Sequence, residues 1–181
     1  MIERIKSVML GAIAPALALL PSNMDTPAAR VLLLAIGLHE SGLEHRDQLE
    51  RNGKNTVLGP ALSFWQFERA GGTLGVLQHK KSNIHAERVC KARGVNPDSR
   101  AVWERMATDD VLGAAFARLL IYTDPLVLPA DSDVDAAWRL YLRTWRPGAY
   151  ERGSDEVRKA LREKFGRNHA VAREFVMGGR K

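Results

Sequence analysis

The chain has 181 residues, long enough for one domain with a sizeable core, and 45% hydrophobic and 27% charged residues are ordinary for a globular protein. A formal net charge of +6 and a pI of about 9.8 favour an anionic partner, a class that includes nucleic acid, acidic lipid and the bacterial cell wall. The single cysteine, Cys90, excludes an internal disulfide framework and a multi-cysteine metal site.

The N-terminal segment contains an apolar run from Val8 to Leu20, preceded by Arg4 and Lys6. Basic residues before an apolar run are also typical of a secretory signal peptide. The run is too short to span a bilayer, and Pro15 interrupts it. We therefore expect residues 1–25 to form a helix that packs on the core, without membrane insertion.

A strongly apolar helix is predicted next. Thr26 followed by Pro27 is an N-cap with proline at the first helical position. Every residue from Val31 to Leu38 is apolar or glycine, so this helix has no polar face and should be buried centrally. The polar stretch 41–55 predicts a short helical turn and then a loop. Residues 56–72 mix turn residues with aromatics, which predicts either a small strand pair or a short helix.

The rest of the chain shows helical spacing of its apolar residues, with glycine and proline at the predicted ends. The sequence contains no internal repeat, low-complexity tract or linker. It therefore predicts a single all-α domain over residues 1–181, with at most a small β element, a core in residues 26–150 and a basic C-terminal helical pair in 151–181. The predicted helices are 84–97, 98–110, 108–125, 131–148, 155–168 and 169–179.

The end of the apolar helix, AIGLHESGLEH, combines two histidines with two glutamates and at first suggests a zinc protease. Zinc-binding histidines on one helix need i and i+4 spacing, but the fourth residue after His39 is Leu43, and His45 faces elsewhere. No serine lies in a nucleophile elbow, and Cys90 has the surroundings of a packing residue. We expect neither a metal nor a cofactor.

Glu40 should lie where the buried helix reaches the surface. Partial burial and the negative end of the helix dipole both disfavour a carboxylate, so the pKa of Glu40 should be raised. A carboxyl that is protonated near neutral pH can act as general acid on a glycosidic oxygen. From its position alone, an exposed helix-end residue is the open alternative.

The segment GPALSFWQFE, residues 59–68, bears on this choice. Its glycine and proline predict a tight turn before the aromatic pair Phe64 and Trp65 and the amide of Gln66. Aromatic rings in a cleft can stack on sugars, and an amide can hold an acetamido group or position an acid. The alternative is that both rings belong to the core and that the amide of Gln66 is satisfied internally.

Together these segments resemble the lysozyme-like superfamily of peptidoglycan-cleaving enzymes, in particular soluble lytic transglycosylases and goose-type lysozymes. Glu40 and Ser41 match the Glu-Ser that ends an apolar helix in that family. GPALSFWQF resembles its Gly-Ala-x-Gly-Leu-Met-Gln motif, with Gln66 at the Gln. AAWRLYLRTWRPG lies where its Tyr-Asn-Ala-Gly helix belongs, with Tyr141 at the Tyr. The chain is also similar to small proteins encoded by bacteriophages and prophages.

The pattern departs from that of the family in three places. Pro60 stands at the first glycine of the Gln motif, and Ser63 replaces the second. Tyr141 is followed by Leu-Arg in place of Asn-Ala-Gly. The loop between Glu40 and Gln66 is longer than in typical transglycosylases and nearer in length to that of goose-type lysozymes.

The resemblance implies a glycosidase or lytic transglycosylase that cleaves the β-1,4 bond between N-acetylmuramic acid and N-acetylglucosamine, with Glu40 as general acid and base. Other implied roles are binding substrate, orienting Glu40 and lining the cleft, and the candidates for them are Ser41, Phe64, Trp65, Gln66, Tyr141 and Trp145. The candidates for a second carboxylate, which would position a water in a hydrolase, are Glu44, Asp47 and Glu50. Solvent-facing charge is the default role of these three.

The implied partner is bacterial peptidoglycan in the periplasm, which such an enzyme could reach inside a phage particle, with other virion proteins, or through a holin. Two alternatives remain at this stage. One is a virion structural protein that keeps the fold without activity. The other is a nucleic-acid-binding protein, but the basic residues of the C-terminal segment alternate with Glu156 and Glu163, as in a solvated helix. Those basic residues are Arg158, Lys159, Arg162, Lys164 and Arg167.

Overall fold

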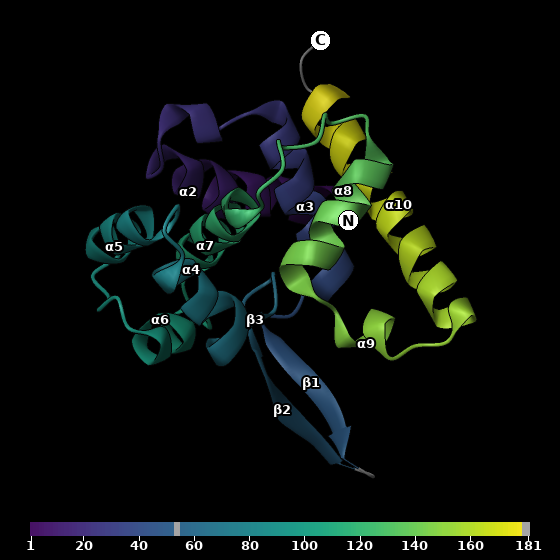
Figure 1. Ribbon diagram of the computed structural model, residues 1–181, viewed down its shortest axis with the longest axis horizontal. Helices are drawn as coiled ribbons and strands as arrows, with labels where there is room; N and C mark the ends of the chain where they lie inside the picture. The colour runs from purple at the N-terminus through teal and green to yellow at the C-terminus, as the bar shows by residue number, and fades with distance from the viewer. Residues whose placement is uncertain (53–54, 179–181) are drawn as a thin grey trace.

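The structure is a computed structural model that describes residues 1–52 and 55–178, with the backbone alone at 48–52 and 55–58. The described chain is 69% helical and carries one small antiparallel sheet (Figure 1). The predicted fold class, mostly α with a small β element, is confirmed at this level. Within the described ranges, none of the helices combines the length and hydrophobicity that crossing a bilayer requires.

The N-terminal segment forms an almost continuous helix from α1 (Ile2–Val8) through a π-helical turn, η1 (Met9–Ile13), into α2 (Ala14–Ala18). Its inner face is buried in the hydrophobic core at Ile5 and Leu17, among others. This face packs against α7 (Asp110–Thr123). The segment thus packs on the core, as its sequence predicts.

Helix α3 (Pro27–Ser41) lies in the middle of the molecule (Figure 1). The Thr26 hydroxyl accepts a hydrogen bond from the backbone N–H of Ala29 at 3.1 Å and caps the helix. Every residue from Val31 to His39 is buried, which confirms the predicted central helix. Gly42 ends it in the left-handed conformation, with φ of 66°.

The sheet has the strand order β1 (Asp47–Asn52), β2 (Asn55–Leu62) and β3 (Phe67–Glu68). The antiparallel β1–β2 ribbon extends away from the helices (Figure 1). The prediction of a turn and loop over 41–55 is therefore wrong for its second half. The polar residues of β1 show no apolar alternation, and their strand conformation depends on pairing with β2, a contact that composition does not reveal. The strand-pair alternative for 56–72 is correct.

Four helices, at 83–92, 99–105, 110–123 and 134–145, lie within the predicted helical ranges to within one residue, whereas 74–78 and 148–151 were not predicted as helices. Side-chain caps fix the starts of α6, α7 and α8, where Asp98, Asp109 and Asp133 each accept a backbone N–H. The remaining described elements are η2 (Ser22–Met24), η3 (Arg69–Thr73), α4 (Leu74–Gln78), α5 (Asn83–Ala92), α6 (Ser99–Arg105), α8 (Val134–Trp145), α9 (Gly148–Glu151) and α10 (Asp155–Gly178).

The predicted C-terminal helical pair is wrong, because α10 is one continuous helix of 24 residues. Phe165, His169 and Ala172 lie at i, i+4 and i+7 and are all buried, and α10 packs along α3. This packing outweighs the cost of about 1 kcal/mol for Gly166 inside the helix. The segment 151–178 is therefore part of the core structure.

Candidate active site

Glu40 and Tyr141 meet where α3 approaches the middle of α8. Glu40 is half-buried in the last turn of α3, and the Tyr141 hydroxyl donates a hydrogen bond to its Oε1 at 2.6 Å. Tyr141 itself is buried. The structure thus brings together two of the predicted site residues from distant parts of the chain.

The protonation of Glu40 is set by opposing effects. Burial raises its pKa to about 7, while the hydrogen bond from Tyr141 and the positive charge of Lys164 act in the lowering direction. Burial also raises the pKa of Tyr141 well above its ordinary value, so its hydroxyl remains a donor. A carboxyl with this pKa can both donate and accept a proton near neutral pH.

The raised pKa predicts how Glu40 affects stability. The unfolded chain releases this proton near pH 4.5, whereas the folded protein retains it until about pH 7. The folded state binds more protons in this window, so the contribution of Glu40 to the free energy of unfolding falls as pH rises from 4.5 to 7. Glu40→Gln should therefore be more stable than the unsubstituted protein by about 3 kcal/mol at about pH 8, but not at about pH 4. Urea unfolding at both pH values measures this, and an equal difference at both would contradict it.

The loop that carries the Gln motif is held against the ends of α3 and α8. The Ser41 hydroxyl donates to the carbonyl oxygen of Phe64 at 2.8 Å and accepts the backbone N–H of Leu43 at 3.1 Å. The Trp145 indole donates to the carbonyl oxygen of Trp65 at 2.9 Å. Ser41 therefore positions the loop rather than presenting its hydroxyl to a ligand.

Gln66 is half-buried in this loop, and its side-chain amide donates to the carbonyl oxygen of Ser63 at 2.8 Å. Both residues adopt left-handed conformations, with φ of 52° at Gln66 and 70° at Ser63. Ser63 is the position at which the lysozyme-like motif has a glycine, so a non-glycine residue here takes a conformation that glycine adopts more readily. The alternative interpretation, in which the amide of Gln66 is satisfied by a hydrogen bond within the protein, is therefore correct for this conformation.

The predicted cleft-lining role of Trp65 is wrong, and Phe64 is almost fully buried. Trp65 is 0% exposed, and its indole N–H donates to the carbonyl oxygen of Leu33 at 2.9 Å inside α3. Phe64 is 4% exposed, with the guanidinium of Arg46 at 4.5 Å from its ring centre. Trp65 therefore offers no accessible face to a sugar and belongs to the core, as the alternative interpretation has it. Phe64 also packs in the core, but it is among the residues that line a cavity of about 480 Å³.

Trp145 differs from these two aromatics because it is half-buried. Its ring stacks beside Tyr141 at a centroid distance of 6.2 Å and meets the edge of Phe67 at 6.1 Å. It therefore lies next to the Glu40–Tyr141 pair with part of its surface exposed.

The three candidates for a second carboxylate have different surroundings. Glu44 forms an ion pair with Arg4 and lines a cavity of about 480 Å³ that Glu40 does not line. Asp47 is exposed at the start of β1. The side chain of Glu50 lies outside the part of the chain that the structure describes, so its role stays a prediction.

The surroundings of Glu40 include a cluster of rings that sequence patterns did not identify. The rings of His39, Trp138 and Phe165 lie 5.1, 5.3 and 5.4 Å from that of Tyr141, measured between centroids. Burial, with a smaller effect of Lys164, lowers the pKa of His39 to about 4, so His39 is neutral at pH 7. The i, i+3 spacing of Trp138 and Tyr141 was visible in the sequence, but the rings that join them from α3 and α10 were not.

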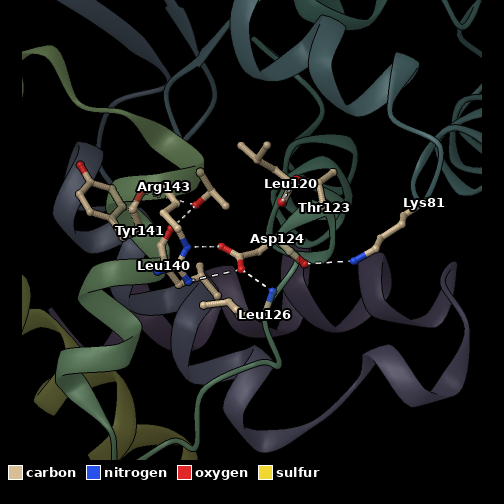
Figure 2. A network of polar contacts seen from close by, with 9 residues as sticks. Lys81, Leu120, Thr123, Asp124, Leu126, Leu140, Tyr141 and Arg143 are labelled. Atoms are coloured by element: carbon tan, nitrogen blue, oxygen red, sulfur yellow. Dashed lines mark hydrogen bonds and ion pairs between the residues drawn. The ribbon is translucent and has the colours of Figure 1, made fainter.

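Helix α8, which carries Tyr141, is tied to the end of α7 by Asp124 (Figure 2). Arg143 donates to the Asp124 carboxylate at 2.8 and 3.3 Å, and the backbone N–H of Leu126 donates at 2.8 Å. From the opposite side, Lys81 donates to the carbonyl oxygen of Asp124 at 3.2 Å. This network fixes the position of α8 against the end of α7.

The Asp124–Arg143 pair predicts an asymmetric response to substitution. The Asp124 side chain is 1% exposed, while that of Arg143 is 38% exposed. Arg143→Ala leaves a buried carboxylate without its cation and should cost about 2–3 kcal/mol of unfolding free energy. Asp124→Asn leaves a guanidinium that water can solvate and should cost about 1 kcal/mol. Urea denaturation of both variants measures this, and a larger loss in Asp124→Asn would contradict the assignment.

The other candidate reactive groups are a metal site among the described residues and the thiol of Cys90. Among residues 1–52 and 55–178, no group of three or more His, Cys, Asp or Glu side chains could hold a metal ion. Cys90 is buried, and burial raises the pKa of its thiol to about 11. Its thiol is therefore protonated at neutral pH, as in a packing residue.

No family model matches this chain, and comparisons with curated proteins and with solved structures give no match either.

Proposed function

We propose that this protein is a peptidoglycan-cleaving enzyme with a lysozyme-like fold, and that Glu40 is its general acid and base. The observation that carries the proposal is the half-buried carboxyl of Glu40 at the end of a buried helix. Its pKa is about 7, and Tyr141 holds it at 2.6 Å. The motif resemblance that links Glu40, Gln66 and Tyr141 supplies the substrate class, the β-1,4 bond between N-acetylmuramic acid and N-acetylglucosamine.

In the proposed first step, Glu40 transfers its proton to the glycosidic oxygen. At the same time the bond between that oxygen and the anomeric carbon of N-acetylmuramic acid breaks. In the second, the muramic 6-hydroxyl attacks this carbon and returns a proton to the Glu40 carboxylate, which yields an anhydro-muramyl end. This route needs one carboxylate. Glu44 is paired with Arg4, which favours this transglycosylase route over hydrolysis by a water that Glu44 would hold.

Substrate contacts are proposed for two half-buried residues, Trp145 through its exposed surface and Gln66 through the oxygen of its amide, since the amide nitrogen donates to Ser63. The net charge of +6 would attract the anionic wall, and salt would weaken this attraction. We further propose that the protein acts in the periplasm and is delivered by a phage particle.

The alternatives receive less support from the described residues. Some of the basic side chains of α10 are paired within the protein, for example Arg162 with Asp135 and Arg173 with Asp131. This disfavours the nucleic-acid-binding alternative. Purified peptidoglycan is incubated with the unsubstituted protein and, in parallel, with Glu40→Gln. Release of muropeptides by the unsubstituted protein alone indicates an enzyme, and release by neither indicates an inactive virion protein.

The pH dependence of the reaction follows from Glu40. Only the protonated carboxyl can donate, so kcat/KM for release of soluble muropeptides should fall about tenfold per unit above a pH of about 7. Burial dominates this pKa, so the falling limb should appear well above the range of an ordinary glutamate. A rate that falls already above about pH 5, as for an unperturbed carboxyl, would contradict the assignment.

A further inference from the structure

We infer that Lys164, on the C-terminal helix α10, is a positioning residue of the Glu40 site, where its ammonium group stabilises the carboxylate that Glu40 becomes on donating its proton. This inference rests on the proposed function. It also assigns a role to a segment outside residues 26–150, which carry the motif resemblance.

The geometry places the Lys164 ammonium at the C-terminal end of α3. Its Nζ donates to the carbonyl oxygen of His39, the residue before Glu40, at 2.5 Å. Carbonyl groups in the last turn of a helix carry partial negative charge, and a cation there is favourable. One ammonium group therefore lies at the C-terminal end of α3, on the carbonyl of the residue that precedes Glu40.

Packing of the neighbouring residue holds Lys164 in this place. Phe165 is 0% exposed, and its ring centre lies 5.4 Å from that of Tyr141 and 5.6 Å from that of His39. Lys164 itself is exposed, so the anchored ring, not burial of the lysine, fixes where the side chain starts. The same aromatic cluster thus positions Tyr141 and Lys164 around Glu40.

The groups that act on Glu40 come from all three packed helices. Tyr141 donates from α8, Lys164 supplies a positive charge from α10, and His39 on α3 is neutral at pH 7. Burial opposes the charged form of Glu40, and Lys164 partly offsets this opposition. Without Lys164, the carboxyl should hold its proton more tightly and deliver it less readily.

In the proposed step the O–H bond of Glu40 breaks and an O–H bond forms on the glycosidic oxygen. A negative charge is left on a half-buried carboxylate, and a nearby ammonium group lowers the free energy of that state. When the 6-hydroxyl returns its proton, the charge disappears again. Lys164 therefore assists the first proton transfer and needs no proton transfer of its own.

The test is an NMR titration of the Glu40 carboxyl carbon, assigned by its loss in Glu40→Gln. Lys164→Met should move the titration midpoint upward by about one pH unit. Lys164→Arg keeps the charge and should leave the midpoint near its original position. Lys159→Met is the matched control, because it removes the same charge from an exposed position of the same helix.

A parallel measurement keeps the test valid if Lys164→Met does not fold. In the unsubstituted protein, high salt should also raise the midpoint, since ionic screening weakens the effect of an exposed ammonium group. The falling limb of the peptidoglycan cleavage profile should move upward with the midpoint in Lys164→Met.

The outcomes separate the two proposals. Cleavage with an unchanged midpoint in Lys164→Met, or an unchanged midpoint at high salt, overturns the role of Lys164 and leaves the proposed function standing. A midpoint that moves equally in Lys159→Met also overturns it, because the effect is then one of net charge. Absence of cleavage by every variant, with a shifted midpoint, overturns the proposed function while the electrostatic coupling holds.

Discussion

Replacing Glu40 by Gln should reduce the release of muropeptides from purified peptidoglycan by at least about 100-fold, the lower range of what a positioned general acid contributes. Gln has nearly the shape of Glu and can still accept the hydrogen bond from Tyr141, but it has no proton to transfer. The variant should remain folded, since Glu40 destabilises the protein above pH 4.5. Loss of activity would therefore report chemistry and not unfolding.

The matched control is Glu44→Gln, which makes the same replacement four residues along the chain. Glu44 is paired with Arg4 at an exposed position, and this pair should contribute less than about 1 kcal/mol. In the transglycosylase route this variant should keep most of its activity. If Glu40→Gln cleaves peptidoglycan nearly as fast as Glu44→Gln, Glu40 is not the general acid.

Replacing Trp65 by Ala should lower the free energy of unfolding by about 3–5 kcal/mol, the largest stability loss expected for this chain. The indole is fully buried, and its N–H satisfies the Leu33 carbonyl inside α3. A methyl group at Gly37 would lie 2.5 Å from Leu43 Cδ2 and 3.4 Å from Trp65 Nε1, so the space beside the ring is filled. Truncation leaves a cavity and removes the second hydrogen bond of the Leu33 carbonyl, which keeps its bond within α3.

Trp103→Ala is the comparison for this prediction. Trp103 also donates its indole N–H to backbone carbonyls, but it is only half-buried. Its truncation should cost clearly less, because water can reach the vacated space. Urea unfolding measures both variants, and equal losses would contradict the expectation that burial of Trp65 sets the larger cost.

Local signals in the sequence predicted the helices well, because caps and breakers act over a few residues. Thr26 and Pro27 set the start of α3, and Pro147 follows the end of α8. The two errors have a common physical cause. Strand β1 exists through its pairing with β2, and α10 continues through Gly166 because α3 packs against it. Both depend on contacts between distant segments.

The residues of the candidate site likewise fall into two groups, those that a local sequence signal marked and those whose role depends on contacts between distant segments. Glu40 was marked by its place at the end of an apolar helix, and Tyr141 by its order along the chain after the Gln motif. Whether Trp65 is a ligand-facing or a core residue depends on what covers it, and the motif looks alike in both cases. Lys164 was hidden because its contact with His39 joins α10 to α3. No spacing within either segment indicates such a contact.

Mass analysis of the products from purified peptidoglycan tests the central proposal most directly. The unsubstituted protein should release soluble muropeptides that end in anhydro-muramic acid, and Glu40→Gln should release almost none. Reducing ends in their place would keep Glu40 as the acid but assign hydrolysis. Release of no muropeptides by the unsubstituted protein would contradict the proposal that the Glu40–Tyr141 site cleaves peptidoglycan.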